Sequence, residues 1–294
     1  AVRLDPKNAD RYVGRAGVFK NAGQYASALA DYDEAIRLDP KEPARYTGRG
    51  EVWEENGDYD RAMADYDKAL SLDPRNAVAY GDKANVWRIR GRVDRALAEI
   101  NAALRLQPKN PFFLTALADI YHEKGDNDLA LATFGRALAL NPKSAITFGN
   151  RGVLLHDLGE YDRAMADFDE AIRLDPKLNK SFSSRGDLWR QKGDLVRALA
   201  DHDQAIRLNP GDDIGYLFRG DTLRYKGDFA AALADYDVVL KRAPDDIAAL
   251  TSRGLTYEKM NNLAKARADF EKAITSKAQE RANINKSSLE TARA

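Results

Sequence analysis

The chain contains no cysteine in its 294 residues, which excludes disulfides, thiol nucleophiles and thiolate metal ligands. Basic and acidic residues balance at 46 each, so no net charge favours nucleic acid or an anionic membrane. No apolar run approaches the roughly 20 residues that a membrane helix needs. The first residues, AVRLDPKNAD, do not resemble a signal peptide. We therefore expect a soluble, most simply cytoplasmic protein without a cofactor, a nucleic-acid partner or a membrane span.

Prolines, in contrast, are present in a strict pattern. Eight of the ten recur every 34 residues: Pro6, Pro40, Pro74, Pro108, Pro142, Pro176, Pro210 and Pro244. A fixed period of this length indicates an array of similar structural repeats. With this proline numbered as repeat position 32, complete repeats begin at Ala9, Pro43, Ala77, Pro111, Ala145, Asn179, Asp213 and Ile247.

Three further positions keep their character in every repeat. Position 15 is glycine in seven repeats and Asn261 in the eighth, as is typical of a left-handed residue that ends a helix. Position 20 is always alanine, and position 24 is bulky in every repeat. A small residue followed four positions later by a bulky one allows a second helix to approach closely. Each repeat is therefore predicted to be a hairpin of helix A, at about positions 1–14, and helix B, at about positions 16–30.

These residues resemble the tetratricopeptide repeat family, whose pattern is W-x-x-L-G-x-x-Y, then A-x-x-x-F, then P. The first aromatic place of that pattern holds Tyr12, Tyr46, Tyr80, Phe148, Phe182 and Tyr216. The resemblance covers residues 9 to about 278. It implies an all-α, right-handed superhelical solenoid of eight complete helix-turn-helix repeats, with the A helices lining a concave groove. In this family the groove usually holds an extended peptide or a helix from a partner protein.

The two ends of the chain depart from the repeat. Residues 1–8 have the phase of the tail of a preceding repeat, and the chain lacks an initiator methionine, so we interpret it as a fragment of a longer protein. The repeat phase is lost near the other end. Residues 279–294 are polar and are predicted to form a terminal cap helix or a frayed tail.

Position 7 is usually arginine here, whereas the family usually has leucine. The same six repeats have aspartate at position 23. Where the arginine is replaced, the acid changes too: Lys83 occurs with Glu99, and Leu117 with Thr133. Such joint change is expected of a direct contact between helices A and B. We therefore predict seven structural ion pairs: Arg15–Asp31, Arg49–Asp65, Lys83–Glu99, Arg151–Asp167, Arg185–Asp201, Arg219–Asp235 and Arg253–Asp269.

A catalytic role for these carboxylates is disfavoured, because an active site is not normally copied seven times. The second aspartate of the repeated motif, at position 25, is exemplified by Asp67. We expect it to contact solvent.

In the family, positions 2, 5, 9, 12 and 13 of helix A face the groove. Positions 9 and 12 vary here beside nearly constant packing positions, which indicates where the repeats differ in role. The candidate partner-binding residues are Glu51, Glu54, Glu55, Asp119, His122, His156, Asp187, Arg190, Leu217, Phe218, Asp221, Arg224 and Tyr225.

Two groups among these candidates allow alternative interpretations. The pairs Asp187–Arg190 and Asp221–Arg224 have i,i+3 spacing, so each pair either neutralises itself or presents an arginine to a carboxylate of the partner. The seventh repeat has an unusually apolar helix A, with Ile214, Leu217, Phe218 and Tyr225. This helix is either a binding hot spot or packs against the eighth repeat.

The three histidines do not indicate a metal site. His202 stands at position 24, where other repeats have large apolar or aromatic residues, and is predicted to be a core residue. His122 and His156 occupy position 12 of adjacent repeats. Helices packed about 8–10 Å apart hold such rings too far from each other to share one ion at ~2 Å.

The sequence thus predicts a non-enzymatic scaffold that binds a protein or peptide in its concave groove, through repeats four to seven. A chaperone-binding carboxylate clamp is set aside, because no repeat has lysine at position 5. Two alternatives stay open. The array could be the accessory part of an enzyme whose catalytic domain lies outside this chain, or it could self-associate through its open ends.

Overall fold

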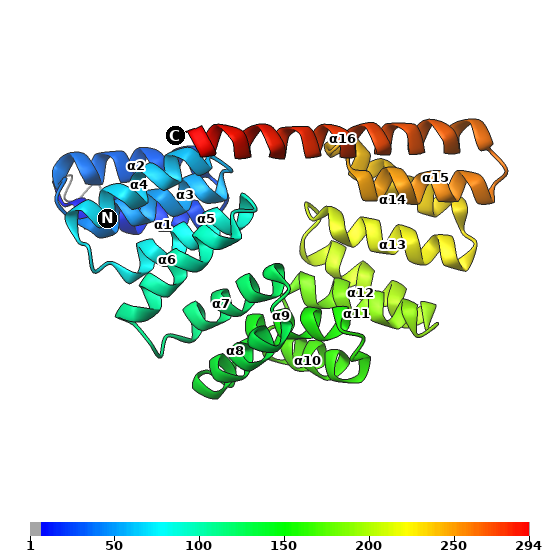
Figure 1. The fold of residues 1–294 in the computed structure, drawn as a ribbon, viewed down its shortest axis with the longest axis horizontal. Coiled ribbons are helices and arrows are strands. Elements are labelled where there is room, and N and C mark those ends of the chain that lie inside the picture. Colours follow the sequence, from blue (N-terminus) through cyan, green and yellow to red (C-terminus); the bar gives the residue numbers. More distant parts are fainter. Residues whose placement is uncertain (1–6, 294) are drawn as a thin grey trace. The chain divides into compact units, whose positions relative to one another are not determined.

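The structure is a computed structural model that describes residues 7–293, with side chains described to residue 278. Over this range the chain is entirely α-helical, with eight helical hairpins and no β-strand (Figure 1). The A helices are α1 (Ala9–Asn21), α3 (Pro43–Glu55), α5 (Ala77–Ile89), α7 (Pro111–Lys124), α9 (Ala145–Asp157), α11 (Asn179–Gln191), α13 (Asp213–Lys226) and α15 (Ile247–Lys259). The B helices are α2 (Tyr25–Leu38), α4 (Tyr59–Leu72), α6 (Val93–Leu106), α8 (Asn127–Leu140), α10 (Tyr161–Leu174), α12 (Leu195–Leu208), α14 (Phe229–Arg242) and α16 (Leu263–Arg293).

The predicted all-α hairpin architecture is confirmed, and each A helix begins where a repeat was predicted to begin. The last helix, α16, continues beyond the repeat to Arg293. The predicted tail of a preceding repeat falls mostly on residues 1–6, outside the described residues. Among the helices that are described, none is both long enough and apolar enough to cross a membrane.

The chain divides into two compact parts, which we call the N-terminal half (residues 1–142) and the C-terminal half (residues 143–294). Within each half, the two helices of a hairpin pack together, and helix B of one repeat packs against helix A of the next. The A helices also contact one another: α3 with α5, α5 with α7, α9 with α11, α11 with α13, and α13 with α15. Each half therefore has a continuous surface of A helices, which we call its helix A face.

Position 15 ends helix A as predicted. All seven glycines at this position have positive φ angles, and Asn261 has a φ of 58°. In the second repeat, Gly57 N donates to Glu54 O at 2.9 Å, and the following Asp58 N donates to Trp53 O at 2.8 Å. These bonds satisfy carbonyls that the end of a helix leaves without partners. The short turn then returns helix B along helix A.

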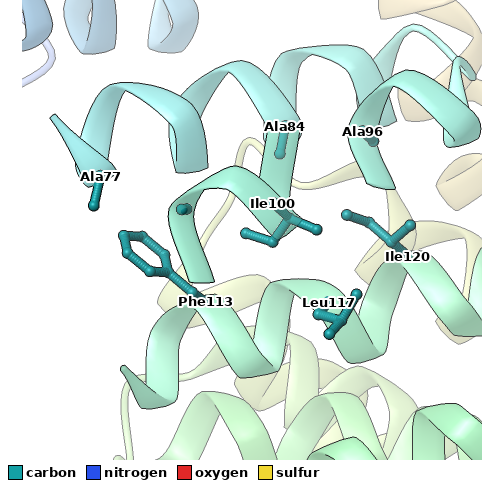
Figure 2. Close-up of a cluster of buried hydrophobic side chains, with 8 residues drawn as sticks. Ala77, Ala84, Ala96, Ile100, Phe113, Leu117 and Ile120 are labelled. Carbon is teal, nitrogen blue, oxygen red and sulfur yellow. The ribbon is translucent and has the colours of Figure 1, made fainter. Parts of the chain in front are cut away.

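The bulky residue at position 24 packs on position 8 of the same repeat. A Cβ atom added to Gly152 would lie 2.7 Å from the Phe168 ring, so glycine provides the space that this ring fills. The third repeat has Ala84 at position 8 and the smaller Ile100 at position 24. Figure 2 shows Ile100 directed toward Leu117 and Ile120 of α7, within a buried apolar cluster. Leu117, which replaces the usual arginine, thus joins this cluster.

The arginine at position 7 joins the two helices of its hairpin. Arg49 Nε and Nη2 donate to Asp65 Oδ2 and Oδ1 at 2.8 and 2.7 Å. The same two-bond arrangement occurs in Arg15–Asp31, Arg151–Asp167, Arg185–Asp201, Arg219–Asp235 and Arg253–Asp269. Lys83 Nζ lies 3.0 Å from Glu99 Oε1. The six aspartates are buried and the arginines are partly exposed, so these part-buried pairs combine charge with two hydrogen bonds.

The aspartates at position 25 are mostly exposed, as expected, but they also form ion pairs that were not predicted. Asp33 Oδ1 accepts from Arg49 Nη1 of the next repeat at 2.6 Å. Equivalent links between repeats are Asp67–Lys83, Asp169–Arg185, Asp203–Arg219 and Asp237–Arg253. Each of these cations therefore bonds one acid in its own repeat and one in the preceding repeat. The aspartates at positions 23 and 25 thus connect the two helices of a hairpin and successive hairpins, respectively.

Candidate partner-binding faces

In the N-terminal half, α3 presents three glutamates on the helix A face. Lys20 Nζ from α1 lies 2.7 Å from Glu51 Oε2 and 3.7 Å from Glu55 Oε1. Glu54 is more enclosed and accepts hydrogen bonds from Tyr66 Oη, at 2.8 Å, and from Asn85 Nδ2. Burial raises the pKa of Glu54, and the neighbouring glutamates raise it further. The structure thus brings the predicted acidic residues together.

Asp82, at position 6 of the third repeat, belongs to this group and was not among the predicted residues. Its Oδ2 atom is buried and has no hydrogen-bond partner in the described part of the chain. Burial, followed by repulsion from Glu51 and Glu54, raises the pKa of Asp82 to about 8, although Lys20 opposes the shift. Burial raises the pKa of Tyr66, and the charge of Asp82 raises it further.

Asp119 and His122 lie half-buried on α7, in the same half. Beside them Glu123 Oε1 accepts from Arg88 Nη1 of α5 at 2.6 Å. His156, the other histidine at repeat position 12, belongs to the C-terminal half. Among the residues that the structure describes, no group of three or more His, Asp or Glu side chains could hold a metal ion.

In the C-terminal half, a cavity of about 170 Å³ opens on the helix A face. It is lined by Val153, His156, Asp157, Phe168, Ser184, Asp187 and Phe218. The aromatic rings and Val153 make part of its wall apolar, whereas the imidazole, hydroxyl and carboxylates provide polar groups. Three predicted residues, His156, Asp187 and Phe218, therefore meet at one cavity.

Asp187 is held by several donors at this cavity. Arg190 donates to Asp187 Oδ1 from Nε at 2.9 Å and from Nη2 at 2.5 Å. Gln191 Nε2 donates to Asp187 Oδ2 at 2.8 Å and lies 2.7 Å from His156 Nε2. The geometry therefore favours the self-neutralising interpretation of the Asp187–Arg190 pair.

The second acid–base pair is looser. Arg224 Nη2 lies 3.4 Å from Asp221 Oδ1, which also accepts from Tyr236 Oη at 2.9 Å. The guanidinium carbons of Arg190 and Arg224 lie 5.0 and 5.1 Å from the centre of the Tyr225 ring. These distances are typical of cation–π contacts. Tyr225 is nevertheless 62% exposed, so much of this platform faces solvent.

The other apolar residues of the seventh repeat divide between core and surface. Leu217 packs against a cluster with Val239 and Leu250, from α14 and α15, so packing against the eighth repeat accounts for it. Phe218 lines the cavity, and Ile214 is 45% exposed. Packing against the eighth repeat therefore accounts for Leu217, whereas a partner-binding role for Phe218 and Tyr225 stays a prediction.

His202 is a core residue, as predicted, with no exposed surface. Its Nε2 lies 3.1 Å from Thr222 Oγ1, and that hydroxyl donates to Phe218 O at 2.9 Å. Because the Thr222 hydroxyl gives its one hydrogen to Phe218 O, it accepts a hydrogen bond from His202, whose Nε2 therefore carries the hydrogen. Burial lowers the pKa of His202 to about 4, because the charged imidazolium would lose its hydration.

Comparison with known proteins gives a consistent result. The tetratricopeptide repeat family model matches residues 14–77, 54–111, 115–179 and 219–281. No curated protein sequence matches the chain.

The likeness extends to solved structures. A tetratricopeptide repeat protein from Parabacteroides merdae is similar with a TM-score of 0.65 and 22% identity, over 84% of this chain and 98% of that one. The PilF protein of Pseudomonas aeruginosa is similar with a TM-score of 0.56 and 20% identity, over 72% of this chain and 97% of that one. A chain of the APC/C hetero-tetramer Cut9–Hcn1 is similar with a TM-score of 0.67 and 18% identity, over 76% of this chain but 44% of that one.

At these identities the solved structures show a shared fold. The family matches span most of the chain, which consists of helical hairpins. The chain therefore belongs to the tetratricopeptide repeat family, whose members generally mediate protein–protein interactions.

Proposed function

We propose that this chain is a non-enzymatic scaffold that binds a peptide or helix of a partner protein in a groove formed by its A helices. The cavity on the C-terminal helix A face is the observation that carries this proposal. Its volume of about 170 Å³ suits one side chain, since a cavity of about 150 Å³ can hold benzene. A single anchoring side chain in a pocket is a common centre of protein–protein recognition.

The difference between constant and variable positions of the repeat supports the proposal. The residues that recur, at positions 7, 8, 20, 23 and 24, are used in ion pairs and packing. The cavity is instead lined mainly by positions that change, as Val153, Asp187 and Phe218 illustrate. Exposed Tyr225, held beside Arg190 and Arg224, offers a rigid aromatic surface at the same face. Tyrosine and arginine are frequent in binding hot spots.

The test is selection of peptides from a random library displayed on phage, with the purified chain as the target. Val153→Trp should fill the cavity and weaken binding of the selected peptides at least about tenfold, equivalent to about 1.4 kcal/mol. Val196→Trp is the matched control, because Val196 is 81% exposed on helix B and lies outside the cavity. Peptides that bind both variants as tightly as the original chain would contradict this site.

A further inference from the structure

The helix A face of the N-terminal half has more acidic than basic residues, although one of the acids, Asp10, pairs with Arg45. At positions 2, 5, 6, 9, 12 and 13 of its four repeats there are seven carboxylates and two cations, a formal charge of −5. The carboxylates are Asp10, Glu51, Glu54, Glu55, Asp82, Asp119 and Glu123, and the cations are Lys20 and Arg88. The same positions in the C-terminal half hold four acids and four bases, although the whole chain is neutral.

The cations of this face do not neutralise its centre. Lys20 forms ion pairs with Glu51 and Glu55, and Arg88 forms one with Glu123. Glu54 receives hydrogen bonds from Tyr66 and Asn85, two neutral groups. Asp82 lies beside it with a buried oxygen that has no partner within the described residues. Among the described side chains, Glu54 and Asp82 therefore have no cation partner of their own.

Exposed apolar side chains accompany these acids. Val78 and Ile89 on α5 are each 45% exposed, and Phe112 on α7 is 68% exposed. Val78 and Phe112 occupy position 2 of the third and fourth repeats, and Ile89 occupies position 13 of the third; both positions face the groove in the family. A face that combines acidic groups lacking a cation partner among the described residues with exposed apolar groups is complementary to a segment that carries both positive charge and apolar side chains.

We propose that the helix A face of the N-terminal half binds a lysine-rich, amphipathic segment of the partner protein, with one ammonium group placed between Glu54 and Asp82. This inference rests on the proposed function and specifies the chemistry of the partner. The apolar side chains of the segment contact Val78, Ile89 and Phe112, while its lysines approach the glutamates of α3. Because the accessible carboxylates lie near the surface, binding weakens as salt concentration rises.

Binding of the ammonium group also has a consequence for protons. Asp82 interacts electrostatically with Glu51 and Glu54 from α3, with Lys20 from α1 and with Tyr66 from α4. Burial and repulsion from the two glutamates favour the protonated form of Asp82 in the free protein, whereas Lys20 opposes it. A bound cation favours the carboxylate instead, so the Asp82 proton is released to solvent as the complex forms.

The experiment uses the full chain and a fluorescein-labelled amphipathic peptide of lysine, leucine and alanine. We expect binding that weakens with salt, and no binding of the same peptide with glutamate in place of lysine. Glu54→Gln with Glu55→Gln should weaken binding at least about tenfold. The charge-matched control is Asp94→Asn with Asp128→Asn, which changes exposed acids on the B helices of the same half and should preserve affinity. Equal binding of the glutamate peptide, or an equal loss in the control, would overturn the proposal.

Calorimetry in buffers with different ionisation enthalpies measures the released proton. The original chain should release a proton on binding the lysine peptide, and Asp82→Asn should not. An unchanged proton count would remove Asp82 from the site. Light scattering tests whether a second copy of the chain occupies this face. If the original chain is a dimer and the variant Glu54→Gln with Glu55→Gln is a monomer, a second copy fills the face, contrary to the proposal. If the lysine peptide does not bind while the phage-selected peptides still bind in a way that depends on Val153, this inference is rejected and the proposed function is retained.

Discussion

His202 should make this protein lose stability in mild acid. Other repeats place a non-basic side chain, such as Phe168, at the same position. In the folded chain burial lowers the pKa of His202 from 6.5 to about 4. Below pH 6.5 the unfolded chain therefore binds a proton that the folded chain excludes. The free energy of unfolding thus falls as pH decreases, and the loss ends when the folded histidine is protonated near pH 4.

The magnitude follows from the same values. Lowering the pH from 7 to 5 should cost about 2 kcal/mol of stability through His202 alone. The full loss, reached near pH 4, is about 3 kcal/mol. His202→Phe should remove this component while preserving the packing of a ring over Gly186. Thr222 keeps its hydrogen bond to Phe218 O, so we expect the variant to change stability by only about 1 kcal/mol at neutral pH.

Urea unfolding, followed by circular dichroism at several pH values, tests this prediction. Repeat arrays can unfold in segments, so hydrogen exchange of the α12 amides should be measured in parallel. His122→Gln is the control, because His122 is only half-buried, on α7. The original chain and the control should lose stability in acid, whereas His202→Phe should lose less. Parallel losses in all three proteins would show that burial of His202 does not produce the acid sensitivity.

Three further predictions concern the acids. Arg151→Met should destabilise the chain by about 3–5 kcal/mol, because it leaves the buried Asp167 without its partner, and adding Asp167→Leu should restore part of the loss in urea unfolding. An equal or larger loss in the double variant would contradict the pairing. Asp169→Asn removes only the exposed link to Arg185 and should cost at most about 1 kcal/mol in the same assay. Asp82 has a pKa of about 8 in the folded chain, so the free energy of unfolding decreases as the pH rises from about 4 to 8. Asp82→Asn, which cannot ionise, should therefore be more stable than the original chain at pH 9. No gain relative to the original chain at pH 9, with equal stability at pH 4, would refute this.

The repeat boundaries were predictable because each is marked by residues with special backbone geometry. Proline cannot continue a helix, and glycine or Asn261 readily adopts the positive φ angle that ends one. These constraints act within a few residues and are visible in one chain. The pairing of position 7 with position 23 was also visible, because Leu117 and Thr133 lose their charges together.

Contacts between repeats were harder to predict. Arg49 lies 16 residues after Asp33 and 16 residues before Asp65, and it bonds both. Periodicity alone does not specify which side of helix B faces the next repeat, so only the contact within the repeat was inferred. A signal did exist, since Asn101 replaces the acid 16 residues before Leu117.

The importance of position 6 was missed for a related reason. Asp82 is placed beside Glu54 by packing of α3 against α5, a contact that connects two repeats. Leu217 shows the opposite case, because it was predicted to bind a partner and instead packs on the eighth repeat. Whether a side chain on helix A faces solvent or its neighbour depends on the angle between adjacent hairpins, which the pattern of residue types does not define.

The neutral charge of the chain conceals two separate populations of charged residues. The acids at positions 23 and 25 bond the cation at position 7, as Asp33, Arg49 and Asp65 illustrate, so most of these charges cancel within the fold. On the helix A face of the N-terminal half, Glu54 and Asp82 have no such pairing within the part of the chain whose side chains are described. An interaction surface is therefore characterised by its local charge rather than by the total. The zero net charge of the chain excludes a protein-wide attraction for anions or cations, but it is compatible with a basic partner that binds this face.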